Sequence, residues 1–150
     1  MNGKLESTLV GVAGEYLVAG ELTLRGYIAS ITLRNSRGID IIASNADGSK
    51  SVSIQVKTNG KSQKSWMLNK KAETFHSENH YYVFVALEDL GQRPKFHIVP
   101  SKVVAEYTST SHSEWLKGKK RDGTDRRDSL LRKFNDPEDK YLEAWDLIQL

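Results

Sequence analysis

Three side chains in two neighbouring segments are of the types that could bind a divalent cation and act on a phosphodiester. Asp40 lies in the run GIDIIAS at 38–44, and Gln55 and Lys57 lie in the run SVSIQVK at 51–57. Carboxylate and amide oxygens are hard ligands that suit Mg²⁺, and a bound divalent ion generates a nucleophile from water near neutral pH. A lysine ammonium can orient that water or stabilise charge that develops on phosphorus. These residue types predict metal-assisted hydrolysis if the fold brings them together.

A tight turn between the two runs would bring these side chains onto one surface. Asp47-Gly48 lies between alternating apolar residues, which predicts a hairpin with a type I′ turn and positive φ at both residues. Cross-strand partners then have residue numbers that sum to 95, so Asp40 lies opposite Gln55 and Gly38 opposite Lys57. Because side chains alternate along a strand, Asp40, Gln55 and Lys57 share one face. The apolar residues of both strands form the core face, and a bulge would shift the register by one residue. Those core residues are Ile39, Ile41, Ala43, Val52, Ile54 and Val56.

A fourth acidic candidate lies in the first helix that the sequence predicts, over residues 7–25. Glu15 stands between Val12 and Ala19 and so interrupts an otherwise apolar stripe. A buried carboxylate requires a partner or a metal ion, which makes Glu15 a plausible member of the site. Glu21 competes with Glu15 for this role.

The remaining elements form a mixed pattern of strands and helices in a single domain over 1–150. We expect a helix where apolar residues recur at three- and four-residue steps, and a strand where short β-rich runs occur. The predicted order is α-β-β-β-α-β-β-α, an α/β (α+β) arrangement of sheet and helices. The segments after the hairpin are a short helix at 69–77, strands at 81–87 and 95–99, a short helix from Pro100-Ser101 through 107, a basic mobile loop at about 108–133, and a last helix from 136 that carries Tyr141, Trp145 and Ile148.

Positive charge is concentrated in two segments, although the whole chain has a net charge of only +3. Residues 57–71 and 117–133 each sum to +5, so the rest sums to −7, because 3 − 5 − 5 = −7. Clustered lysine and arginine side chains suit phosphate contacts, whereas a solvated loop is the alternative reading of a charge run. The candidates for contact with a nucleic acid are Lys61, Lys64, Lys70, Lys71, Lys119, Lys120 and Arg121.

Composition excludes several other kinds of site. The chain has no cysteine, so disulfides and thiolate metal centres are ruled out, and a reducing, cytoplasmic compartment is expected. No apolar run approaches the ~20 residues that span a bilayer, and the first residues do not resemble a signal peptide. His76 and His80 have the spacing of zinc ligands, but H-E-x-x-H is not present, so exposed histidines are the better interpretation.

The residues above carry a family resemblance. Asp40 followed by Gln55-Val56-Lys57 resembles the D…(D/E/Q)-x-K core of the PD-(D/E)XK nuclease superfamily. The segments GEYLVAGELTLRGY from Gly14, RGIDIIA and IQVKTN resemble its Holliday-junction-resolvase-like and Mrr-like branches, over roughly the first 60 residues. The resemblance implies a restriction-endonuclease-like core and an endonuclease that hydrolyses DNA with Mg²⁺, for which Mn²⁺ could substitute.

The same resemblance implies a role for each site residue. Asp40, Gln55 and the Val56 carbonyl would hold the metal, Glu15 would be the acid contributed by the helix, and Lys57 would be the catalytic lysine. DNA would be the partner, and a homodimer would allow both strands to be cut.

Two positions depart from the family pattern. Ile39 replaces the proline before the aspartate, which is a common loosening of the motif. Gln55 replaces an acidic residue, and the loss of one negative charge should weaken magnesium binding. Two alternatives therefore stay open: a DNA-binding module of the same fold that no longer cuts, and a structural or protein-interaction domain.

Overall fold

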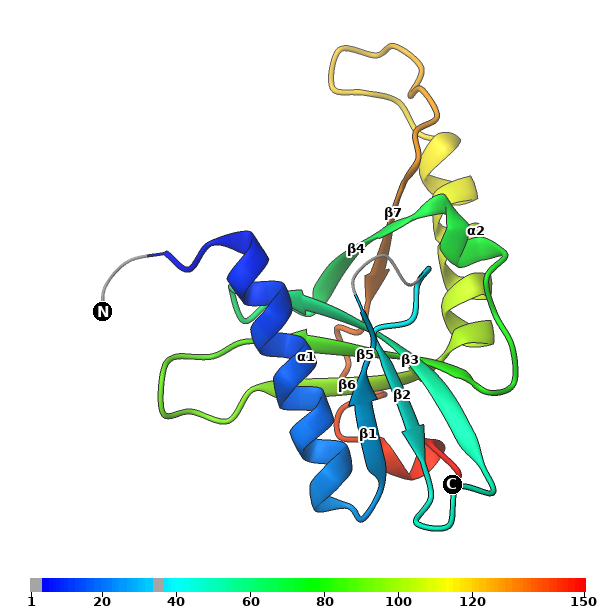
Figure 1. The fold of residues 1–150 in the computed structure, drawn as a ribbon. Helices are drawn as coiled ribbons and strands as arrows, with labels where there is room; N and C mark the ends of the chain where they lie inside the picture. The colour runs from blue at the N-terminus through cyan, green and yellow to red at the C-terminus, as the bar shows by residue number, and fades with distance from the viewer. Residues whose placement is uncertain (1–3, 34–36) are drawn as a thin grey trace.

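The computed structural model describes residues 4–33 and 37–150, and Figure 1 shows their arrangement. The secondary structure follows the mixed pattern expected from the sequence. The elements in chain order are α1 (Ser7–Leu24), β1 (Ile28–Ile31), β2 (Ile41–Ser44), β3 (Ser51–Asn59), β4 (Ser65–Asn69), the 3₁₀ helix η1 (Lys70–Glu73), β5 (His80–Ala86), β6 (Lys95–Pro100), α2 (Ser101–Leu116), β7 (Leu131–Asn135) and the 3₁₀ helix η2 (Trp145–Leu147).

One mixed sheet forms the centre of the fold. Its strand order is β1-β2-β3-β5-β6, with β3 and β5 parallel and the other neighbouring pairs antiparallel. A second, two-stranded sheet pairs β4 with β7 in antiparallel fashion. The expected mixed α+β fold class is thus confirmed.

The predicted register of the β2–β3 hairpin is correct from Ile41 to Ser44, although the predicted turn type is wrong. Ile41 pairs with Ile54 and Ser44 with Ser51, so partner numbers sum to 95 as expected. Of the two described residues Asp47 and Gly48, only Gly48 has a positive φ, at 73°. The Gly48 amide bonds to the Asn45 carbonyl at 3.0 Å, and Asn45 and Lys50 close the loop at 3.2 Å. The loop between Asn45 and Lys50 is longer than the predicted two-residue turn, but it is centred on the same residues, Asp47 and Gly48. The pairing of β2 with β3 is therefore the one predicted.

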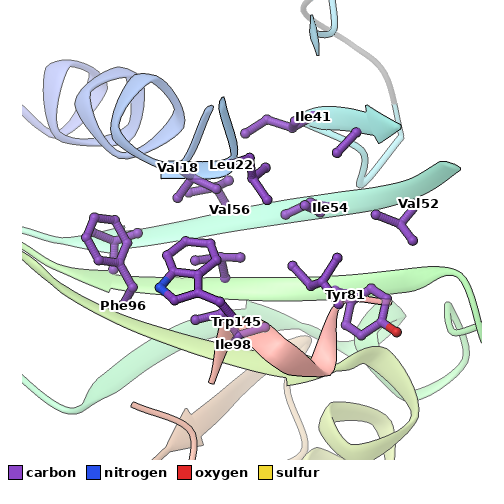
Figure 2. Packing of buried hydrophobic residues seen from close by; sticks show 14 residues of the cluster. Val18, Leu22, Ile41, Val52, Ile54, Val56, Tyr81, Phe96, Ile98 and Trp145 are labelled. Atoms are coloured by element: carbon purple, nitrogen blue, oxygen red, sulfur yellow. The ribbon is translucent and has the colours of Figure 1, made fainter. Parts of the chain in front are cut away.

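Hydrophobic cores lie on both faces of the central sheet. On one face, Val18 and Leu22 of α1 pack on Ile54 and Val56, and Trp145 packs beside them (Figure 2). The core on the opposite face is formed by β4, β7, η1 and α2 with the other side of the sheet. Its buried residues are Trp66, Leu68, Ala72, Tyr82, Phe84, Ala86, Val99, Val104 and Phe134. β5 is buried along its whole length, as its continuous apolar run predicts.

Several predictions for the second half of the chain are wrong. The helix expected at 69–77 is a single 3₁₀ turn, η1, which follows a strand that was not predicted. The helix that starts at Ser101 continues to Leu116 instead of ending at Tyr107. The loop expected at 108–133 therefore covers only 117–130, because α2 and β7 take up its two ends. In Figure 1 this shorter loop extends beyond the ends of α2 and β7, away from the central sheet.

The last helix expected from 136 onward is also wrong, apart from the short turn η2. Asp139 and Glu143 have positive φ values of 57° and 53°, which a right-handed helix cannot contain. The buried Asp136 carboxylate accepts hydrogen bonds from His97 Nδ1 at 2.7 Å and from the Tyr141 amide at 3.0 Å. These contacts hold the segment as a folded turn while Trp145 still reaches the core.

No helix among the residues that the structure describes has the length and apolar character needed to cross a bilayer.

Candidate active site

The hairpin ladder changes register by one residue at Asp40. The Asp40 amide bonds to the Ile54 carbonyl at 2.8 Å. Their numbers sum to 94, whereas the β2–β3 pairs sum to 95, so the ladder has a bulge-like offset at this point. On its other side, the Asp40 carbonyl accepts the Thr32 amide at 2.9 Å. The backbone of Asp40 is therefore held from both neighbouring strands where regular pairing ends.

The Asp40 side chain takes over a hydrogen bond that the ladder no longer supplies. β3 continues to Asn59, beyond the last residue paired with β2, so its amides on that edge need other partners. Asp40 Oδ2 accepts the Val56 amide at 2.7 Å. Because Val56 lies between Gln55 and Lys57, this bond fixes the carboxylate at the motif that the sequence analysis singled out. The hairpin thus brings Asp40 to the Gln55–Lys57 segment, but the Asp40 backbone pairs with Ile54 instead of lying opposite Gln55 as expected.

Burial raises the pKa of the Asp40 carboxyl above its ordinary value of 3.8. The Val56 hydrogen bond and the positive charge of Lys57 lower the pKa, but they do not outweigh the loss of solvent. A cation that binds beside this half-buried carboxylate would stabilise its charged form.

Gln55 and Lys57 line a cavity of about 460 Å³ on the face of the sheet opposite α1. The complete lining is Arg37, Gly38, Gln55, Lys57, Leu68, Asn69, Lys71, Ala72, Thr74, Phe75 and Tyr82. Gly38, with a φ of 66°, brings the backbone close to this cavity: a Cβ there would lie 3.6 Å from Gln55 Oε1 and 3.2 Å from the Phe75 ring. Asp40 is not part of this lining; its carboxylate accepts the amide of Val56, which lies between the two lining residues Gln55 and Lys57. The cavity thus combines the amide, the amine and two further cations.

Glu15 approaches from the other layer of the fold. Helix α1 packs on the face of β3 that carries Val56, whereas Gln55 and Lys57 point to the opposite face. The closest approach is at Gly14, where a Cβ would lie only 1.8 Å from Thr58 Oγ1. The helix backbone therefore lies directly on the residue after Lys57. This contact places the backbone of Glu15 near the end of β3 that contains Lys57 and Thr58.

The oxygen donors at this edge suit a hard cation. Among residues 4–33 and 37–150, no three His, Cys, Asp or Glu side chains gather at one point where they could hold a metal. A cation at Asp40 would therefore depend on amide, carbonyl and water oxygens as well as on carboxylate, which is a common environment for Mg²⁺. The donor set Asp40, Gln55 and Val56 fits this description.

The basic candidates for nucleic-acid contact lie in different places. Lys71 lines the cavity, and Lys70 precedes it in η1. Lys61 is exposed after β3, but Lys64 pairs with Asp139 at 2.8 Å.

Three further basic candidates lie on the 117–130 loop. Lys120 and Arg121 are exposed there, and Lys119 is paired with Asp125. Such pairs already offset part of the charge of Lys64 and Lys119. Lys71 is thus the one of these seven predicted cations that shares the cavity with Lys57.

Of the residues that line the cavity, the sequence analysis named only Gln55, Lys57 and Lys71 as site candidates, and it missed Arg37, Phe75 and Tyr82 among others. Arg37 directly precedes Gly38-Ile39-Asp40, and its place in that motif was a usable signal. Phe75 and Tyr82 belong to segments read as a helix and a buried strand, and no local pattern relates them to Gln55. Only the parallel pairing of β3 with β5 brings Tyr82 opposite Gln55.

Comparisons with known proteins support this architecture. No family model matches the chain, and no curated protein matches it. The solved structure of a bacterial homing endonuclease is similar over 97% of this chain and 92% of its own, with a TM-score of 0.58 at 17% sequence identity. A Holliday junction resolvase from the archaeal hyperthermophile Archaeoglobus fulgidus is similar over 83% of each chain, with a TM-score of 0.49 at 17% identity. The likeness with a TM-score of 0.58 shows the fold alone: the chain has a restriction-endonuclease-like fold, as the residues around Asp40 and Lys57 led us to expect.

Proposed function

We propose that this protein is a metal-dependent endonuclease that hydrolyses phosphodiester bonds in DNA. The observation that carries the proposal is the hydrogen bond from the Val56 amide to Asp40 Oδ2, at 2.7 Å. It holds a carboxylate between an amide and an amine that face one cavity. The solved structure with a TM-score of 0.58 is a homing endonuclease by its title, which agrees with this reading.

The metal ligands of the proposal are Asp40, Gln55 Oε1, the Val56 carbonyl and Glu15. The N–H and C=O of one strand residue point to the same edge. The Val56 carbonyl is therefore directed toward Asp40, like its amide. Mg²⁺ is the expected ion, with Mn²⁺ as a substitute, and when bound it would supply Lewis-acid stabilisation and lower the pKa of a coordinated water.

The cations of the cavity act on the substrate in this proposal. Lys57 orients the attacking water and stabilises the negative charge that develops on the phosphoryl oxygens. Water then adds to phosphorus, the bond to the leaving oxygen breaks, and that oxygen takes up a proton. Lys71 and Arg37, on the rim, hold the flanking phosphates by charge. The exposed Lys61, Lys70, Lys120 and Arg121 extend this contact along the DNA backbone, with weaker contributions from the ion-paired Lys64 and Lys119.

Plasmid nicking in the presence of Mg²⁺ tests the proposal. Asp40→Asn and Lys57→Ala should each lower the nicking rate by at least about 100-fold, because each removes a group that acts on the transition state. Asp47→Asn and Lys50→Ala make similar changes at the turn end of the same hairpin and should leave the rate unchanged. Circular dichroism should show that all four variants are folded. Equal nicking by wild type and both site variants would reject the assignment.

Gln55 favours a second candidate function, a DNA-binding module that no longer cuts. With an amide in place of an acid, the site has one negative charge fewer to hold the cation. This alternative predicts salt-sensitive DNA binding without cleavage in Mg²⁺ or Mn²⁺. Calorimetric titration with Mg²⁺, run beside the nicking assay, separates it from the nuclease and from a domain that binds neither ligand.

A homodimer also belongs to the proposal. One site can hydrolyse one strand at a time, so a cut through both strands at one position is simplest with two copies of the chain. Sedimentation of the protein with and without DNA measures whether that second copy is present.

A further inference from the structure

One side of the cavity that contains Gln55 and Lys57 is apolar and aromatic, which phosphate binding alone does not require. Leu68 and Ala72 are buried there, and Tyr82 is buried to 1% exposure. Phe75 differs from them, because 42% of its surface is exposed. An aromatic side chain that is open to solvent beside three cations is an unusual combination for a purely electrostatic groove.

The Phe75 ring is held in place by its neighbours. It meets the His80 ring edge-on, with centroids 4.9 Å apart and an interplanar angle of 74°. His80 Nδ1 in turn lies 2.7 Å from Ser53 Oγ. The Phe75 amide bonds to the Lys71 carbonyl at 2.8 Å, and the ring packs against the backbone of Gly38. A ring fixed in this way loses little entropy when a flat group stacks on it, which favours binding.

Building on the proposed nuclease function, we propose that this cavity receives an unstacked nucleobase of DNA beside the phosphate that is cut, with Phe75 as the stacking surface. A volume of about 460 Å³ lies within the range of sites that bind small ligands. Asn69 and Thr74, also in the lining, place an amide and a hydroxyl where they can meet the edge of a base.

The substrate class follows from the cost of bringing a base into the cavity. A paired base must break its base pair and leave its stack before it can enter a pocket. For an unpaired base, the free-energy cost of this movement is smallest. The proposal therefore assigns DNA with an unpaired nucleotide at the cleavage position as the preferred substrate. Stacking on an aromatic side chain is tolerant of sequence, because every base has a π face.

Three DNAs of equal length test the assignment: a perfect duplex, the same duplex with one unpaired nucleotide, and a single strand. Fluorescent 2-aminopurine at the unpaired position reports stacking, and Ca²⁺ in place of Mg²⁺ allows binding to be measured without relying on cleavage. Wild type should bind the DNA with the unpaired nucleotide about 10-fold more tightly than the duplex, with a change in 2-aminopurine fluorescence. The base–aromatic contact is the source of this difference.

Substitutions at Phe75 identify the stacking surface. Phe75→Ala and Phe75→Leu should both bring binding of the unpaired-nucleotide DNA down to the duplex level, whereas Phe75→Trp should retain the preference. Phe75→Leu keeps apolar packing against His80, so its loss of preference would come from the flat ring. Trp115→Ala is the matched control, because Trp115 is 43% exposed but already stacks on His112 with centroids 5.6 Å apart.

The outcomes separate this inference from the proposed function. Equal binding of all three DNAs by wild type, or an unchanged preference in Phe75→Leu, would overturn the base pocket even if the protein nicks plasmids. An unpaired-base preference that depends on Phe75, found in a protein that cuts no DNA, would support the pocket while rejecting the nuclease.

Discussion

Asp40 combines two properties at the scale of a single residue: its carboxylate satisfies a backbone amide, and burial disfavours its charge. The Val56 amide donates its hydrogen bond to Oδ2 of this carboxylate. The opposing effects of burial and of Lys57 make the charge of Asp40 sensitive to what binds beside it. Two predictions follow from this residue and from Gln55.

The first prediction concerns stability against pH without metal. Because the folded protein raises the pKa of Asp40, folding favours its protonated form. This contribution is present below the ordinary value of 3.8 and is lost as pH rises through the higher folded-state pKa. Asp40→Asn removes the negative charge that burial disfavours. The melting temperature of this variant should therefore exceed that of wild type at pH 7. The difference should shrink toward acid pH, and thermal melts across pH measure it.

Mg²⁺ should reverse that order, because the cation stabilises the wild-type carboxylate and not the amide. A wild type less stable than Asp40→Asn at saturating Mg²⁺ would contradict the assignment of Asp40 as a ligand.

The second prediction concerns the charge of the metal site. Gln55→Glu should bind Mg²⁺ about 10-fold more tightly, because the number of charged ligands tunes affinity. Without metal, the new carboxylate should destabilise the protein by repulsion with Asp40. Calorimetric titration measures the affinity, and Gln92→Glu, in the exposed loop before β6, is the control. Unchanged Mg²⁺ affinity in Gln55→Glu would show that this position is not a ligand.

At the scale of elements, the contact between α1 and β3 sets the position of Glu15. Gly14→Ala should destabilise the protein by about 1–3 kcal/mol, because its Cβ would overlap Thr58. Gly11→Ala, in the same helix, meets nothing within 4 Å and should be neutral or stabilising by up to about 1 kcal/mol. Chemical denaturation measures both changes. Thr58→Ala should partly rescue Gly14→Ala, and equal effects of the two glycine substitutions would contradict the close packing.

The sequence predicts this half of the fold well because its signals are local. Alternating apolar residues around Asp47-Gly48 define both strands of the hairpin and their register. That register places Gln55 and Lys57 on one face and brings Asp40 to the same end of β3. The offset at Asp40 was not predictable, because it depends on Ile54 and Val56 bonding to different parts of the same residue.

In the second half, the strands β5 and β6 and the start of α2 were predicted, but the other elements were predicted poorly because their contacts are distant in the chain. β4 and β7 pair Trp66 with Phe134 across a separation that no short pattern reveals. The spacing of Tyr141, Trp145 and Ile148 fits a helix, but the buried Asp136 binds the backbone in a turn instead. Phe75 joins the site in the same way, through tertiary packing. Sequence reasoning therefore found the proposed metal ligands but not the walls of the cavity.

At the scale of the whole molecule, positive charge is divided between the cavity, which Arg37, Lys57 and Lys71 line, and the 117–130 loop. In Figure 1 this loop extends away from the central sheet. If DNA spans both, replacing Lys119, Lys120 and Arg121 with alanine should flatten the salt dependence of binding. Each phosphate contact contributes about 0.9 to the slope of log K against log salt, so the change should be about 2, less than three full contacts because Asp125 already pairs with Lys119. Lys102→Ala, in α2, is the control. If the slope of the triple variant equals that of wild type, the bound DNA does not contact the 117–130 loop.

The last twenty residues cross from one face of the sheet to the other. Phe134 completes the core against α2, and Trp145 and Ile148 complete the core against α1. Without this segment, α1 would still cover one face and β4, η1 and α2 the other, but each core would lose a large aromatic side chain. A chain cut back to residue 130 should therefore be digested by protease far faster than one that contains residues 131–150.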